Sequence, residues 1–295
     1  MGAGFQVLAM IITVLIAIII AFANTKWRPY IYTTMMVTLA LWGFLNGYVT
    51  SRTLKFFGTT DWNFSATIAA FTLPLFITVT LGFELLLAWL TRSALRYSFK
   101  ANLFRIVGWY LLNGCMCYLG AYRGYVQKAV EVPSPVGRVP RPIPPLPCHM
   151  SIFVLAPVFG FIQFAGMYAE FSYLIDSVFR SRMYAMFGFL LLNILLQVLT
   201  ISLLAILQTY LQLCYQHWEW WWRSFVTGAS GAVFMAIYSV FFLVTKMKIS
   251  DFVSDACFLV YVAVFIVCYG AAAGAIAVNA SYYFVANIYS SIRKD

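Results

Sequence analysis

The feature that most constrains this chain is a series of long apolar segments separated by short polar gaps. A helix needs about 20 mostly apolar residues to cross the hydrocarbon core of a bilayer. Only 9% of the residues are charged and 63% are hydrophobic, whereas a soluble domain carries about a quarter charged residues. The sequence therefore predicts an all-α polytopic membrane protein, a single bundle of about eight transmembrane helices. We expect these helices at about 5–23, 30–50, 66–90, 103–123, 152–175, 184–210, 224–245 and 256–288.

The longest gap, 124–150, contains seven prolines between Pro133 and Pro147. Proline at that density fixes an extended, polyproline-like path and excludes helix. Two interpretations remain open for this loop. It is either a stiff spacer between two four-helix halves or a docking strip for a soluble partner.

The net charge of +10 comes from basic residues that stand singly or in pairs in the gaps. They form no stripe that could follow a phosphate backbone, so we expect no nucleic acid partner. Anionic lipid head groups are a simpler explanation for the charge, and the lipid bilayer is the first expected partner.

Catalytic and metal-binding motifs are missing from the sequence. The six cysteines form no CxxC pair and there are only two histidines, so no metal site and no cofactor is expected. The chain also has no GxSxG, no HExxH and no phosphate-binding loop. We therefore predict no catalytic residues and no enzyme activity.

Two acids lie within the predicted spans, Glu84 and Glu170. Ionisable groups inside a membrane are costly and often mark a path for an ion or substrate. The alternative is a hydrogen-bonded role in helix packing. If the acids carry a function, the protein is a secondary transporter or channel.

Three GxxxG spacings occur in the apolar segments, at Gly43/Gly47, Gly120/Gly124 and Gly270/Gly274. Small residues at this spacing let two helix backbones approach closely. Packing within the chain is one use of such a face. The sharper hypothesis is that Gly270 and Gly274 bind the transmembrane helix of another protein, a client.

A tryptophan-rich stretch, "CYQHWEWWWRSF", lies between two apolar segments at 214–225. Indole rings favour the head-group layer of a bilayer, and an arginine there suits anionic lipid. We predict an interfacial anchor made by Trp218, Trp220, Trp221, Trp222 and Arg223.

Several stretches, in order along the chain, resemble the nonaspanins, also called the transmembrane 9 superfamily or endomembrane protein 70 family. These stretches are "GYVTSRTLKFFGTTDW" (47–62), "YLGAYRGY" (118–125), "VPRPIP" (139–144), "MYAMFGFLLL" (183–192), "WWWRSFVTGAS" (220–230), "VFFLVTKMKISDFVS" (240–254) and "FVANIYSSIRKD" (284–295). The resemblance covers essentially the whole chain. It implies the multispan C-terminal membrane domain of a nonaspanin without the N-terminal luminal domain and first span.

The resemblance also implies a function and a location. Nonaspanins are Golgi and endosomal proteins implicated in sorting other membrane proteins, so this chain is expected to be multi-pass there with both termini and the proline-rich loop in the cytosol. The family's C-terminal signal contacts the COPI coat, and the matching residues are Arg293, Lys294 and Asp295. Arginine at 293 replaces the usual lysine and keeps the charge but not the ammonium geometry.

Two departures from the family pattern bear on function. Leu203 stands where a glutamate is usual, and Gln216 and His217 replace an acidic pair, whereas Glu170 matches a Glu or Gln position. We therefore expect a trafficking and sorting protein that recognises client helices. The alternatives are a transporter or channel that uses Glu84 and Glu170, and a structural scaffold of a membrane assembly.

Overall fold

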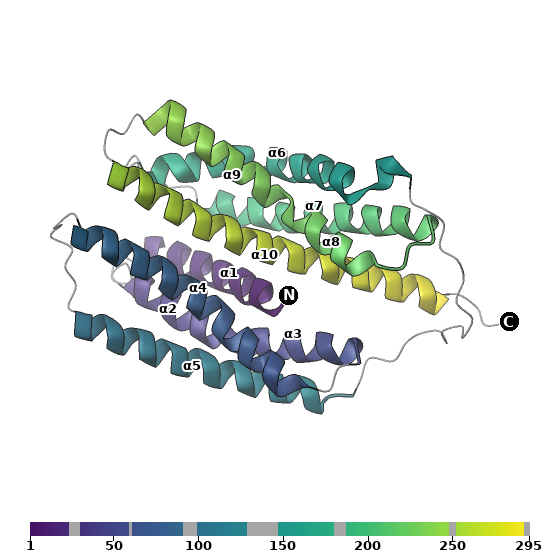
Figure 1. The fold of residues 1–295 in the computed structure, drawn as a ribbon, viewed down its shortest axis with the longest axis horizontal. Helices are drawn as coiled ribbons and strands as arrows, with labels where there is room; N and C mark the ends of the chain where they lie inside the picture. The colour runs from purple at the N-terminus through teal and green to yellow at the C-terminus, as the bar shows by residue number, and fades with distance from the viewer. Residues whose placement is uncertain are drawn as a thin grey trace. The chain divides into compact units, whose positions relative to one another are not determined.

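The computed structural model describes residues 1–23, 30–58, 61–90, 99–128, 147–179, 187–247 and 252–291. Over these ranges the chain is helical and contains no strand. The helices are α1 (Gly2–Ala23), α2 (Ile31–Leu41), α3 (Gly43–Phe56), α4 (Trp62–Leu90), α5 (Phe99–Val126), α6 (Ile152–Phe179), α7 (Phe187–Cys214), α8 (Trp220–Ala229), α9 (Gly231–Phe242) and α10 (Phe252–Ser291) (Figure 1). A 3-10 turn, Cys148–Met150, precedes α6, and a π-helical turn, Leu243–Met247, follows α9.

Six helical stretches of the described chain are long and apolar enough to cross a membrane. They are Gly2–Ala21, Trp62–Phe83, Ile152–Ser177, Gly188–Cys214, Trp220–Lys246 and Val253–Ser291. This confirms the prediction of an all-α polytopic membrane protein. The predicted segments 30–50 and 103–123 are helical but fall outside this set. The first is divided at Trp42 into α2 and α3, and the second lies in α5, where Asn113 and Arg123 lower the hydropathy.

The chain divides into two compact units. Unit 1 comprises 1–129 and 236–268, and unit 2 comprises 130–235 and 269–295, so that α9 and α10 each contribute to both.

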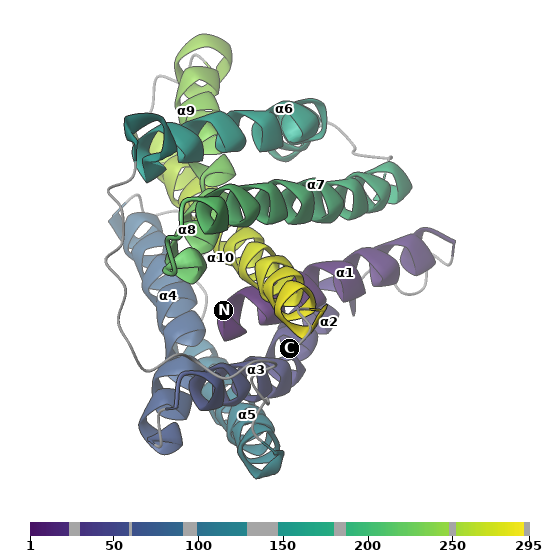
Figure 2. The ribbon, with the colours of Figure 1, turned by 90° about the vertical axis from the view of Figure 1, so that its right-hand side faces the viewer.

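Unit 1 is organised around a close contact between α3 and α5, which lie side by side in Figures 1 and 2. Two of the GxxxG pairs meet here. A Cβ atom on Gly47 would collide with the backbone oxygen of Cys117, and one on Gly120 would collide with that of Phe44. One on Gly124 would lie 2.8 Å from the Tyr48 oxygen. Glycine is therefore required at these positions for the two backbones to approach.

A cluster of three amide side chains lies at the centre of unit 1. Gln6 donates to the Leu39 oxygen at 2.7 Å and to Asn113 Oδ1 at 2.8 Å, and Asn46 donates to Gln6 Oε1 at 2.9 Å. Gln6, Asn46 and Asn113 are completely or almost completely buried. The three amides thus tie α1, α2, α3 and α5 together in a mutually paired network.

Pro74, inside α4, explains why Asn113 donates a hydrogen bond to the backbone of that helix. Proline has no backbone N–H, so the oxygen four residues earlier, on Ala70, loses its helical donor. Asn113 Nδ2 donates to that oxygen at 2.9 Å, and Asn46 Nδ2 donates to the neighbouring Ala69 oxygen at 3.0 Å. A polar group freed by proline inside an apolar bundle is satisfied by a neighbouring helix.

Unit 2 comprises α6, α7, α8, the first part of α9 and the C-terminal part of α10. The helices α6, α7 and α8 contact one another, and small residues bring α8 close to α10. A Cβ atom on Gly228 would lie 2.5 Å from that of Ala277 and 2.7 Å from the Ala273 oxygen. Residues 272–278 of α10 are all buried. The small-residue run "AAAGAIAV" is therefore a helix-packing face of unit 2.

Candidate functional site

The junction between α8 and α9 interrupts an otherwise continuous membrane helix in the middle of unit 2. Ser230 separates the two helices, and both its backbone N–H and its Oγ donate to the Thr227 oxygen, at 3.4 and 2.6 Å. Gln163 Nε2 on α6 donates to the same oxygen at 3.0 Å. Glycine at 231 costs a helix about 1 kcal/mol relative to alanine, and its sequence neighbours are small. The interruption therefore creates a polar centre among apolar helices.

Gln197 on α7 and Tyr269 on α10 complete this centre. Gln197 Nε2 donates to the Tyr269 hydroxyl at 2.8 Å and to the Gln163 backbone oxygen at 3.1 Å. A Cβ atom on Gly231 would lie 2.9 Å from Gln163 Oε1 and 3.2 Å from the Tyr269 hydroxyl. The missing side chain of Gly231 therefore leaves the room that these two polar groups occupy.

Three hydroxyl groups continue the polar line along the α7–α8–α10 contact. Thr209 Oγ1 donates to Ser281 Oγ at 2.8 Å, and Ser281 Oγ lies 2.7 Å from Ser224 Oγ. Ser281 also donates to the Ala205 backbone oxygen at 3.3 Å. All three side chains are at most 1% exposed. Each hydroxyl thus has a partner within the helix contact.

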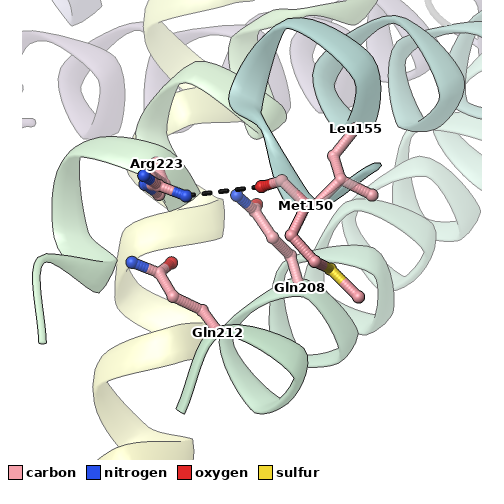
Figure 3. A pocket seen from close by; sticks show the side chains of 5 residues that line it. All are labelled: Met150, Leu155, Gln208, Gln212 and Arg223. Atoms are coloured by element: carbon pink, nitrogen blue, oxygen red, sulfur yellow. Dashed lines mark hydrogen bonds between the residues drawn. The ribbon is translucent and has the colours of Figure 1, made fainter. Parts of the chain in front are cut away.

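A small pocket ends this line, lined by Met150, Leu155, Gln208, Gln212 and Arg223 (Figure 3). Arg223 Nη1 on α8 lies 3.4 Å from the Met150 backbone oxygen, at the start of α6. Gln208 and Gln212 come from the last two turns of α7. Both side chains are buried, although they lie beside a guanidinium group.

We name the polar side chains of this line the polar seam. Its members are Gln163, Gln197, Gln208, Thr209, Gln212, Arg223, Ser224, Thr227, Tyr269 and Ser281. The seam follows one face of α7, from Gln197 to Gln212, a rise of about 22 Å at 1.5 Å per residue. That length is comparable with the hydrocarbon thickness of a bilayer, about 30 Å.

The seam contains buried acceptors that no protein group satisfies. Among the described residues, six buried side-chain atoms have no hydrogen-bond partner, and four of them belong to the seam. These four atoms are Gln163 Oε1, Gln208 Oε1, Gln212 Oε1 and Thr227 Oγ1. A buried polar atom without a partner costs about 1–3 kcal/mol. The seam is therefore the part of unit 2 whose unpaired hydrogen-bonding atoms are available to a small ligand.

Of the two predicted intramembrane acids, only Glu170 has a side chain in the described part of the structure. Glu170 is 4% exposed and lies on α6 seven residues, two turns, beyond Gln163. It therefore continues the α6 side of the polar seam away from the pocket. The side chain of Glu84 lies outside the described part of the structure, so its role stays a prediction.

The glycines of the predicted client-binding face are both buried within unit 2. A Cβ atom on Gly274 would lie 2.6 Å from the Phe225 ring, and one on Gly270 would lie 3.4 Å from the Ala232 Cβ. The face is already occupied by α8 and α9 of the same chain. A client helix could reach Gly274 only if Phe225 moved away.

The tryptophan cluster links the end of α7 to the start of α8. Trp218 and Trp222 are exposed, whereas Trp220 is buried, and the Trp218 and Trp221 rings are 5.3 Å apart. The chain leaves α7 through Gln216, which has a positive φ of 59°. The N–H of His217 bonds the Gln212 oxygen and that of Gln216 bonds the Leu213 oxygen, the pattern of a Schellman cap. The exposed rings are consistent with the predicted interfacial anchor, which stays a prediction.

Two further predictions fall partly or wholly outside the described residues. The tail residues Arg293, Lys294 and Asp295 lie beyond Ser291, and most of the proline-rich loop lies between 128 and 147.

The described residues contain no cluster of three or more ligands that could hold a metal ion.

Sequence reasoning missed the polar seam because it searched the spans for charged groups. The signal was present in the segment 184–210 and its continuation, where Gln197, Gln208 and Gln212 recur at spacings of 11 and 4 residues. Such spacings return to nearly the same face of a helix. Glutamines on one face of an apolar helix indicate a buried polar line as clearly as an acid does.

Comparison with known proteins assigns the chain to a family. The sequence model of the endomembrane protein 70 family matches residues 1–252. A curated relative, transmembrane 9 superfamily member 10 of Arabidopsis thaliana, is 29% identical over all of this chain and 46% of its own length. Human transmembrane 9 superfamily members 2 and 4 are 28% and 26% identical, over all of this chain and 44% and 46% of their lengths.

The chain thus spans a little under half the length of these relatives. No solved structure matches it. The family match covers most of the apolar helices, and the curated relatives cover all of them, so the resemblance seen in the motifs is confirmed. These relatives are members of the transmembrane 9 superfamily, and the chain belongs to the endomembrane protein 70 family.

Proposed function

We propose that this chain is the membrane domain of a trafficking and sorting protein of Golgi and endosomal membranes, and that it recognises the transmembrane helices of client proteins. Its membership of the endomembrane protein 70 family supports the location. An exposed face of α5 supports the mode of recognition and is the observation on which the proposal rests.

The helix α5 has two opposite faces. Its inner face, with Asn113, Cys117 and Gly124, is buried against other helices of unit 1. Its outer face is exposed and consists of Gly108, Leu111, Leu112, Cys115, Leu119 and Tyr122. A Cβ atom on Gly108 would meet nothing within 4 Å, so a second helix has room to approach there. Small residues on a lipid-facing surface favour helix–helix contact in membranes.

The substitution Gly108→Leu tests this face. It should fold normally because the site is open, and it should block close approach of a client helix. Gly82→Leu on α4 is a matched control, because a Cβ atom there also meets nothing within 4 Å. Membrane proteins that co-purify with the wild type should be lost from Gly108→Leu and kept by Gly82→Leu. Identical sets from all three proteins would refute α5 as the client face.

The C-terminal residues Arg293, Lys294 and Asp295 are proposed to contact the COPI coat. A reporter membrane protein carrying the last residues of this chain should stay in the Golgi, and Lys294→Ser should release it to the cell surface. Replacing Arg293 with lysine should retain the reporter at least as well. A wild-type tail that leaves the reporter at the surface would argue against coat binding.

A second candidate function, transport of a small polar solute or ion, is favoured by the polar seam and Glu170. Buried polar groups along membrane helices often line such paths. Proteoliposomes should then show solute flux that Glu170→Gln reduces. Glu219→Gln is the control, since Glu219 is exposed in the turn before α8. Flux that is equal in the wild type and Glu170→Gln would exclude a path through Glu170.

A further inference from the structure

We propose that the pocket at the end of the polar seam is a binding site for one water molecule that bridges α7 and α8. The pocket is lined by Met150, Leu155, Gln208, Gln212 and Arg223. This inference concerns the architecture of unit 2 and is independent of both proposed functions.

Two buried amide oxygens provide the main observation. Gln208 is 2% exposed and Gln212 is 4% exposed, and the Oε1 atoms of both are buried without a hydrogen-bond partner. Figure 3 shows both amide groups and the guanidinium of Arg223 gathered around the same space. Leaving two such acceptors unsatisfied would cost about 1–3 kcal/mol for each. A ligand that donates two hydrogen bonds removes both penalties.

Water fits the donors and acceptors that line the pocket. Its two hydrogens match the two unpaired oxygens of Gln208 and Gln212, and its own oxygen can accept a hydrogen bond from Arg223. The guanidinium group has five N–H donors, and its bond to the Met150 oxygen is long, at 3.4 Å. Buried waters typically make about three hydrogen bonds to groups that are otherwise unsatisfied.

The size and charge of the pocket exclude other ligands. Its volume of about 10 Å³ is near the smallest that holds a single water. A metal ion or ammonium group would lie next to the positive charge of Arg223. An anion would face the two amide oxygens at close range. A neutral molecule of the size of water meets none of these obstacles.

The bound water would have a structural consequence. It would join the last two turns of α7 to the first turn of α8, and Arg223 would link this point to Met150 in the turn before α6. Gln212 Nε2 already lies 3.3 Å from His217 Nδ1 in the turn after α7. The water would therefore help to hold the tryptophan-rich turn against the end of the bundle.

The substitution Gln208→Met distinguishes a hydrated pocket from a dry one by the sign of its effect. In a dry pocket the change removes an unsatisfied oxygen and should raise the melting temperature. In the hydrated pocket it removes one of three hydrogen bonds to the water, and we expect the melting temperature to fall by a few degrees. Leu207→Met, at a neighbouring exposed position, should leave it unchanged.

Cryo-electron microscopy of the full chain in lipid nanodiscs observes the ligand directly. We expect one water-sized density within hydrogen-bond distance of Gln208 Oε1, Gln212 Oε1 and Arg223, and no such density in Gln208→Met. The proposal is overturned by an empty pocket in a map that resolves other waters, by density too large for water, or by a rise in melting temperature for Gln208→Met.

Discussion

The two units of this chain differ in how their buried amide side chains are hydrogen-bonded near a helix break. Each contains an interrupted helix, α2–α3 at Trp42 and α8–α9 at Ser230, and in each a buried glutamine donates to a backbone oxygen near the break. In unit 1 the amides of Gln6, Asn46 and Asn113 pair with one another, and all three side-chain oxygens accept a hydrogen bond.

In unit 2 the corresponding glutamine, Gln163, leaves its oxygen unpaired, as do Gln208 and Gln212. A mutually satisfied network rigidifies a core, whereas unpaired buried acceptors retain the capacity to bind a small polar molecule. The difference indicates that unit 1 is the structural anchor and that the polar seam of unit 2 is the part open to a ligand.

The largest expected effect comes from the same glycine substitution made in each unit. Gly47→Ala places a Cβ atom against the Cys117 backbone, which cannot move without separating α3 from α5. We expect a loss of about 3 kcal/mol in the free energy of unfolding. In Gly270→Ala the added Cβ atom meets nothing closer than the Ala232 Cβ, at 3.4 Å, and the variant should be within about 1 kcal/mol of the wild type.

Denaturant or thermal unfolding in a mild detergent measures both variants. Equal losses for Gly47→Ala and Gly270→Ala would contradict the view that the α3–α5 contact at Gly47 is closer than the α9–α10 contact at Gly270.

A smaller contrast is expected between the two polar clusters. Asn113→Leu removes the donor to the Ala70 oxygen, which has no helical donor because of Pro74, and should cost about 3 kcal/mol. Gln163→Leu also removes a donor, but it eliminates an oxygen that is already unpaired, so about 1 kcal/mol is expected. The melting temperatures of the two variants compare these costs. A larger fall in melting temperature for Gln163→Leu than for Asn113→Leu would contradict the view that unit 1 is the structural anchor.

The turn after α7 offers a stabilising change in unit 2. Gln216 has a φ of 59°, in the left-handed region that glycine adopts without strain. Gln216→Gly should therefore raise the free energy of unfolding by about 1 kcal/mol. Gln216→Ala, which keeps the Cβ atom, is the control and should bring no such gain. A loss of stability in Gln216→Gly would show that the Gln216 side chain makes a contact more valuable than the relief of strain.

The smallest effect concerns pH. Burial, and to a lesser extent the nearby Arg223, lower the pKa of His217 below its ordinary value of 6.5, against the opposite influence of Glu219. The unfolded chain then binds a proton before the folded chain does as the pH falls through 6.5. The stability associated with neutral His217 is present above that pH and lost below it. A slight acid-induced fall in melting temperature should disappear in His217→Gln; a fall of the same size there would assign it to other groups.

Much of the fold follows from the sequence because membrane insertion depends on segment length and hydropathy. The predicted segments 152–175, 184–210 and 256–288 correspond to α6, α7 and α10. The breaks at Trp42 and Ser230 were not predicted, since both lie inside continuous apolar runs. At each break a side chain distant in sequence, Gln6 or Gln163, donates a hydrogen bond to a nearby backbone oxygen.

The candidate site was less predictable than the fold. Glu170 was identified because a charge in a membrane span is conspicuous. The polar seam was not, because glutamine, serine and threonine are common as hydrogen-bonding residues between membrane helices. Whether Gln208 and Gln212 are paired depends on the neighbours that α6 and α8 bring, which a single sequence does not state.

The most direct test of the contrast between the units is the exchange of side-chain amide hydrogens with heavy water. Gln208 and Gln212 line the pocket of unit 2, whereas Gln6 and Asn113 lie in the mutually paired cluster of unit 1. Nuclear magnetic resonance of the chain with isotope-labelled glutamine and asparagine side chains compares the exchange rates of the four amides. We predict that the amides of Gln208 and Gln212 exchange faster than those of Gln6 and Asn113. Equal rates for all four, or faster exchange in unit 1, would contradict the distinction between a closed unit 1 and a hydrated seam in unit 2.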